Sequence, residues 1–119
     1  MNSRWSDIFK HLEDGGYIVY PPTIKTGECT EPYIVVKDAG TTEHGTYSTN
    51  LALFDVMVYL PRNQYSKIEE FVREVENHMD GLFPMIRPTH FKTPSFYDDS
   101  VKGWMVSIQY KNYQKKVRA

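Results

Sequence analysis

The chain has 119 residues, one cysteine and a formal net charge of −1. This length suits one domain, residues 1–119, with a single core. The near-neutral charge gives no electrostatic case for nucleic-acid binding. The lone Cys29 excludes an internal disulfide and a multi-cysteine zinc site within one chain. No apolar run approaches the roughly 20 residues that span a bilayer, and the first residues do not read as a signal peptide, so we expect a soluble, non-exported domain.

The first predicted element is an amphipathic helix over residues 3–14. Its apolar face consists of Trp5, Ile8, Phe9 and Leu12. We expect Gly15-Gly16 to end the helix, because glycine accepts the left-handed conformation that many helix ends need. A short strand over residues 17–20 follows, and the polar segment 23–31 is predicted to be a loop.

A hairpin is predicted next. Its first strand covers residues 33–37, directly after Pro32. Residues 38–50 are polar and rich in Gly, Thr and Ser, so we expect an extended hairpin tip there. The returning strand, residues 51–60, is long and alternating and stops at Pro61.

The strongest helix signal comes after this strand. Ser66 and Glu69 have the spacing of a capping box, in which two side chains satisfy free backbone donors at a helix start. The apolar positions then follow the three-and-four spacing of one helical face. They are Ile68, Phe71, Val72, Val75, Met79 and Leu82. Gly81 and Pro84 bracket the expected end.

The last part of the chain predicts further strands. Prolines interrupt residues 85–96, so any strand there is short or lies at a sheet edge. Residues 98–100 indicate a turn, and residues 102–113 a final strand with one dry and one mostly wet face. The order is α-β-β-β-α-β-β. We therefore expect an α+β fold with two helices and a mainly antiparallel sheet of about four to five strands.

Residue types that often carry chemistry form no catalytic or metal-binding pattern. The histidines are His11, His44, His78 and His90, and none pairs with another at a metal-ligand spacing. Cys29 has the neighbours Glu28 and Glu31, and acidic neighbours raise the pKa of a thiol, which argues against a nucleophile. No phosphate-binding glycine loop, dinucleotide fingerprint or serine-hydrolase motif occurs. We expect no catalytic residue, no cofactor and no metal, and therefore not an enzyme.

Two acidic positions allow alternative interpretations. Asp98 and Asp99 could form a catalytic carboxylate pair, but adjacent acids in a turn are far more often solvated. Asp55 lies inside a long hydrophobic strand. On the wet face of that strand it needs no partner. If it is buried, it needs an arginine or lysine from a neighbouring strand or subunit.

Charge is distributed unevenly over the chain. The outer face of the second helix carries Glu69, Glu70, Glu74, Glu76 and Asp80, whereas the C-terminal tail is basic. The default interpretation of such a helix is a solvated face. The alternative hypothesis is that an acidic and a basic patch form a head-to-tail contact in a ring.

The chain as a whole resembles a known family. A short helix ends at Gly15-Gly16, residues 32–36 read Pro-Tyr-Ile-Val-Val, and a polar hairpin follows. Residues 54–61 then form a strand that leads into an amphipathic helix, and residues 103–110 belong to a closing strand. This pattern resembles the tail terminator proteins of long-tailed bacteriophages, also called tail completion or minor tail proteins.

The resemblance implies a structural role in the virion tail, at the head–tail junction, of a protein made in the cytoplasm of the bacterial host. Members assemble as a ring, commonly a hexamer, that caps the head-proximal end of the tail tube and stops its polymerisation. The implied partners are further copies of the chain, the tail tube protein and a head-completion or connector protein. DNA passes through without sequence-specific binding, and no membrane is involved. We expect contacts from the hairpin tip and the tail, at Glu43, His44, Tyr47, Lys115, Lys116 and Arg118.

The sequence is also compatible with other functions. One is a different phage neck, head-closure or minor tail component. Another is a small non-catalytic α+β interaction domain without a role in a virion. A small enzyme or ligand-binding domain is a further alternative, and it requires a concave pocket with convergent polar groups.

Overall fold

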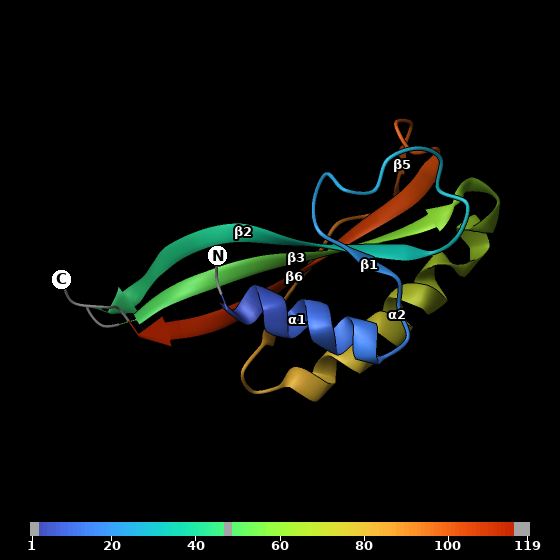
Figure 1. Cartoon of the computed structure of the whole chain (residues 1–119). Helices are drawn as coiled ribbons and strands as arrows, with labels where there is room; N and C mark the ends of the chain where they lie inside the picture. The colour runs from blue at the N-terminus through green and yellow to red at the C-terminus, as the bar shows by residue number, and fades with distance from the viewer. Residues whose placement is uncertain (1–2, 47–48, 116–119) are drawn as a thin grey trace.

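A computed structural model describes residues 3–46 and 49–115 of the chain. Two helices lie on one face of a six-stranded sheet, an α+β fold (Figure 1). The elements are α1 (Ser3–Asp14), β1 (Val19–Tyr20), β2 (Tyr33–Thr46), β3 (Thr49–Pro61), the 3₁₀ helix η1 (Arg62–Lys67), α2 (Ile68–Met79), the 3₁₀ turn η2 (Asp80–Leu82), β4 (Arg87–Lys92), β5 (Phe96–Asp98) and β6 (Gly103–Lys115).

The sheet is mainly antiparallel, as the sequence predicts. Its strand order is β1-β2-β3-β6-β4, and β5 also pairs with β6. β1 is the exception in direction, because it runs parallel to β2 with Val19 opposite Ile34. The sheet has six strands where four to five are expected, since the three-residue β5 forms after the last of the interrupting prolines. β4 lies at an edge, which agrees with its proline.

The hairpin differs from the sequence prediction. Residues 38–46 and 49–50 are strand and not a loop tip: β2 continues to Thr46 and β3 begins at Thr49. Two register shifts interrupt the pairing, and the first lies between Asp38 and Gly40. Gly40 has φ +101°, which favours glycine, and its N–H donates to Asp38 Oδ1 at 2.9 Å. Polar composition indicated a loop, but pairing with β3 keeps these residues in a strand.

The predicted capping box at the start of α2 is wrong. Residues 62–67 form η1, which runs directly into the helix, and the cap position is Lys67 with no side-chain cap bond. The N–H of Ile68 donates instead to the carbonyl of Tyr65. A preceding 3₁₀ turn supplies carbonyls to the first helical donors, so Ser66 and Glu69 are not needed as caps.

The main core lies between the helices and the sheet. α2 contributes four buried side chains, and the predicted Phe71 and Leu82 are only partly buried against the core. The four are Ile68, Val72, Val75 and Met79. From α1, Ile8 and Leu12 are fully buried, and Phe54 on β3 is the largest fully buried side chain.

A smaller cluster fills the opposite face of the sheet at the end away from the hairpin. It consists of Cys29, Tyr33, Tyr59 and Met105. The segment before β2 was predicted to be a polar loop, yet Cys29 within it is buried. The N–H of Cys29 donates to the carbonyl of Val101 at 2.6 Å. A Cβ added to Gly103 would lie 2.9 Å from the Cβ of Cys29. This close packing fixes the loop on the sheet.

The molecule is elongated, with extents of 49 × 26 × 25 Å. The far parts of β2, β3 and β6 run past both helices (Figure 1). We call residues 40–46, 49–53 and 111–115 the arm, because β3 pairs with both β2 and β6 from Gly40, Leu53 and Lys111 outward.

Candidate interaction surfaces

The arm carries the residues for which the sequence predicts contacts. Glu43 and His44 lie in β2, and Lys115 is the last residue of β6. Thr49 pairs with Lys115, so the hairpin end and the end of β6 meet at one tip of the molecule. The other three predicted residues, Tyr47, Lys116 and Arg118, lie outside the described residues. Contacts of these six side chains therefore remain predictions.

The outer edge of β2 is open along most of its length. β1 pairs with only two β2 residues, Ile34 and Val35, and beyond them Trp5 Nε1 donates to the carbonyl of Val36 at 2.7 Å. Among the described residues, no strand pairs with the outer edge from Lys37 to Thr46. A strand edge of this kind offers free backbone donors and acceptors to another chain.

Two histidines that the sequence treats separately meet between the helices. His11 of α1 and His78 of α2 stack with ring centroids 4.2 Å apart. Each Nε2 lies 2.7 Å from the backbone carbonyl of the other histidine. A carbonyl only accepts, so each Nε2 carries a proton and donates it. The pair satisfies carbonyls in the last turns of both helices and joins their ends.

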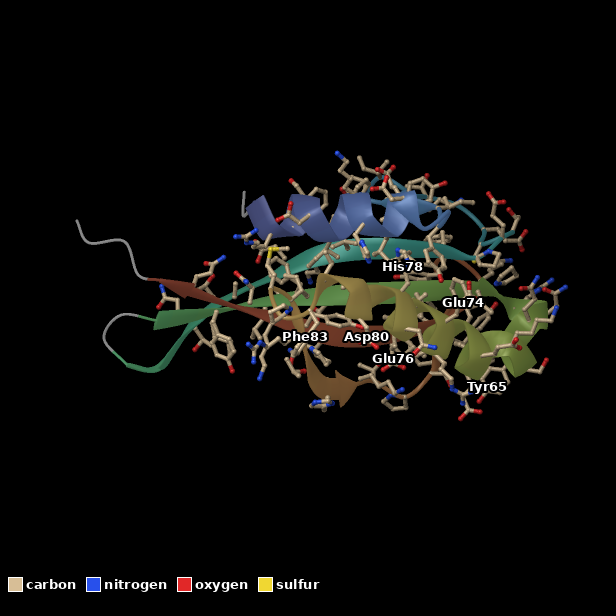
Figure 2. All side chains as sticks on the ribbon, turned by 90° about the horizontal axis from the view of Figure 1, so that it is seen from below. Tyr65, Glu74, Glu76, His78, Asp80 and Phe83 are labelled. Atoms are coloured by element: carbon tan, nitrogen blue, oxygen red, sulfur yellow. The ribbon has the colours of Figure 1, made fainter. Side chains whose placement is uncertain are left out.

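A surface hollow of about 560 Å³ lies between η2, β4 and β6. Its lining residues are Asp80, Phe83, Arg87, Pro88, His90 and Lys111. Figure 2 shows Asp80 and Phe83 at the end of α2 nearer the arm, whereas Tyr65 lies toward the opposite end. β4 bulges here, because Pro88 pairs with Tyr110 and Lys92 with Ile108. Between these two pairs β4 has two more residues than β6. His90, within the bulge, has φ +66°, a conformation that costs a residue with a Cβ about 1 kcal/mol.

Three of the residues that line the hollow are basic types. Arg87 lies directly opposite Lys111 in the β4–β6 pairing. The Arg87 guanidinium is 5.3 Å from the Phe83 ring and 5.8 Å from the Tyr113 ring, and Lys111 Nζ is 5.4 Å from the Tyr113 ring. Phe83 is 60% exposed. The hollow thus combines cations with an exposed aromatic surface.

Asp55 lies on the sheet face opposite the helices and is partly buried. Burial raises the pKa of its carboxyl, and Lys37 counteracts this. Lys37 pairs with Asp55 across β2 and β3. Lys37 is therefore the lysine on a neighbouring strand that a buried Asp55 would need. Asp55 itself is neither fully exposed nor fully buried, so its environment lies between the two alternatives that the sequence left open.

Two of the acidic side chains on α2 have partners within the subunit. Lys92 Nζ lies 3.0 Å from Glu76 Oε1, and the Tyr17 hydroxyl donates to Glu74 Oε1 at 3.0 Å. Burial and the Glu74 carboxylate raise the pKa of Tyr17 to about 12. Glu69 and Glu70 remain exposed near the start of the helix.

Cys29 and Asp98, which the sequence raised as candidates for chemistry, have contacts that explain them as parts of the fold. Burial, as the largest cause, raises the pKa of the Cys29 thiol. Lys25 and the hydrogen bond to the Glu31 carbonyl act in the opposite direction, and the carboxylates of Glu28 and Glu31 add smaller increases. Asp98 Oδ1 accepts bonds from the Ser100 N–H and hydroxyl, which confirms the predicted turn. In the part of the chain that the structure describes, no group of three or more His, Cys, Asp or Glu could hold a metal ion. No described helix has the length and apolar character to cross a membrane.

Sequence reasoning missed the hollow. Prolines indicate only an interrupted strand in this segment, and Lys111 falls within the predicted final strand, residues 102–113. The available signal was a run of aromatic and basic residues between Phe83 and Lys92. Only the β4–β6 register places Lys111 opposite Arg87.

Comparison with known proteins is informative about the fold alone. No protein-family model matches the sequence. No curated protein matches it either. One solved structure is similar over 100% of this chain and 99% of its own, with a TM-score of 0.53 and 18% identical residues. Its name describes no activity or partner. At this identity the likeness indicates a shared architecture.

Proposed function

We propose that this chain is a structural subunit of a phage or prophage tail, one that forms a ring on the head-proximal end of the tail tube. The ring stops tube polymerisation and presents a surface for head attachment. The partners are further copies of the chain, the tube protein and a connector protein, and the work is done without catalysis.

The observation that supports this proposal best is the arm. A three-stranded extension past the helices adds little to the main core, and β2 presents a long open edge there. Extensions with open edges can join other chains by strand addition. A head-to-tail contact of this kind closes into a ring when its rotation divides a full circle.

Mass measurement and electron microscopy of the purified protein test ring formation. We expect a closed oligomer, with a hexamer as the leading expectation, and stronger assembly at low salt if charges contribute. Lys115→Glu with Lys116→Glu should weaken it, and an unchanged oligomer at low salt would count against the basic tail as a contact.

Loss of the gene in a phage that encodes this chain tests the role itself. We expect tails of abnormal length, because tube growth lacks its stop. Normal tails beside heads that leak DNA would support the alternative of a head-closure protein. Normal, infectious particles would contradict a role in the virion.

A further inference from the structure

The hollow between η2, β4 and β6 contains two cations in an unfavourable arrangement. Like charges directly opposite each other on neighbouring strands are destabilising, and Arg87 and Lys111 are such a pair. Among the described side chains, the ion pairs are Arg4 with Asp7 and Lys92 with Glu76. Neither cation of the hollow therefore has a carboxylate partner within this part of the chain. An anion bound between them would relieve the repulsion.

Arg87 is exposed, and three contacts orient its side chain. Its Nε donates to the carbonyl of Pro84 at 3.1 Å, and its guanidinium lies near the rings of Phe83 and Tyr113. These contacts leave the terminal N–H groups of the guanidinium for a ligand. A guanidinium binds planar anions with two parallel hydrogen bonds, and one that is already positioned loses less entropy on binding.

We propose that this hollow is a receptor for a carboxylate on a partner polypeptide. An Asp or Glu side chain binds to Arg87 and Lys111, and an apolar residue beside it packs on the exposed ring of Phe83. The assignment of the carboxylate to a polypeptide rests on the proposed assembly function, whereas the anion site stands on its own geometry.

A carboxylate fits the hollow better than the phosphates of a nucleic acid. Asp80 lines the same hollow, and Glu76 lines the adjoining depression beside His90. These acids disfavour a chain of phosphates more than a single carboxylate. The chain as a whole carries a net charge of −1 and offers no general attraction for a polyanion.

The test is a titration followed by NMR amide shifts, with the dipeptide N-acetyl-Phe-Glu-amide and its isosteric control N-acetyl-Phe-Gln-amide. We expect saturable shifts around Arg87, His90 and Lys111 with the acidic dipeptide, with a Kd on the order of millimolar. The amide control should bind about tenfold more weakly or not at all, since it lacks the charge-assisted bonds.

Variants of Arg87 test whether the acidic dipeptide binds in this hollow. Arg87→Gln should weaken the acidic dipeptide about tenfold, and Arg87→Lys, which keeps the charge without the planar fork, should give an intermediate loss. Arg73→Gln, an exposed position outside the hollow, is the matched control and should bind as the unmodified protein does.

Three results would overturn the proposal: non-saturating shifts, equal binding of both dipeptides, or binding that Arg87→Gln leaves unchanged. An oligothymidylate that saturates the same amides while the acidic dipeptide does not would assign the site to nucleic acid instead. The titration measures dipeptide binding whether the protein is a monomer or a ring. Absence of rings would therefore leave this result standing, and loss of dipeptide binding would leave the ring experiment unaffected.

Discussion

Asp55 is a partly buried acid within a hydrophobic strand. Burial raises its pKa, with Lys37 acting in the opposite direction. The folded state thus favours the protonated acid relative to the unfolded chain. The stabilisation is fully present below the unfolded pKa, about 3.9, and is lost as pH rises through the higher folded value.

Asp55→Asn should therefore stabilise the protein at pH 7. The gain should be no more than about 1 kcal/mol, because Asp55 is only partly buried and Lys37 is opposite it. It should shrink as the pH falls toward 4, because a growing share of the native carboxyl is then protonated. Urea unfolding at both pH values measures this, with Asp99→Asn in the exposed turn as the control. Equal stability of Asp55→Asn and the parent at both pH values would contradict it.

Cys29 should react with thiol reagents only after unfolding. Its side chain is 3% exposed, and burial raises the pKa of the thiol, so little thiolate is present and little of it is accessible. Labelling with Ellman's reagent should be slower in the native protein than in urea, on the order of 100-fold or more. Equal rates would show that the loop before β2 opens freely.

At the scale of elements, the two helices are joined at their ends by His11 and His78. Each ring also lies against a glycine: a Cβ on Gly15 would overlap the His78 ring, and one on Gly81 would come within 3.0 Å of His11 Cε1. Gly15 was expected only to end a helix. Its second role, space for an imidazole, depends on the packing of α1 against α2 and is not visible in local sequence.

A double-mutant cycle tests this arrangement. His78→Ala should cost about 1 kcal/mol, because the His11 carbonyl loses the imidazole donor and keeps only the N–H of Gly15. Gly15→Ala should cost about 1–3 kcal/mol through overlap with the ring. The double variant should cost less than the sum by about 1 kcal/mol, since removal of the ring makes room for the methyl group. Strict additivity in denaturant unfolding would mean that Gly15 matters for another reason.

The sequence predicted elements with strong periodicity best. The helix over residues 3–14 agrees with α1, and the core face of α2 was identified apart from the degree of burial of Phe71 and Leu82. The errors come from residues whose state non-local pairing decides. The polar residues 38–46 form a strand because β3 pairs with them, and Ser66 does not cap because a 3₁₀ turn precedes the helix.

The same distinction applies to the surfaces of the whole molecule. Polar composition led to the prediction of a contact surface at the hairpin, and this stays a prediction. The hollow could not be predicted from the sequence, because Arg87 and Lys111 are distant in sequence and neither is unusual alone. Their proximity follows from the order β3-β6-β4 and a bulged register, which are properties of the assembled sheet.

The proposed contacts between copies lie on the arm, whereas the main core lies in the body of the subunit, and shortening the arm tests this proposal. Removal of residues 42–51 with an Asn-Gly link from Thr41 to Ala52 keeps the β2–β3 hairpin, because these two residues pair and Asn-Gly favours a tight hairpin turn. The main core keeps Phe54 and all four buried residues of α2.

We expect the shortened chain to fold with a loss of no more than about 2 kcal/mol in the free energy of unfolding, since most of its buried apolar area remains. It should stay monomeric under conditions in which the full chain forms rings, because the open edge of β2 is cut back. Near-ultraviolet circular dichroism reports the fold, and native mass reports the assembly. Rings of unchanged size from the folded, shortened chain would place the contacts between copies on the body of the subunit and not on the arm.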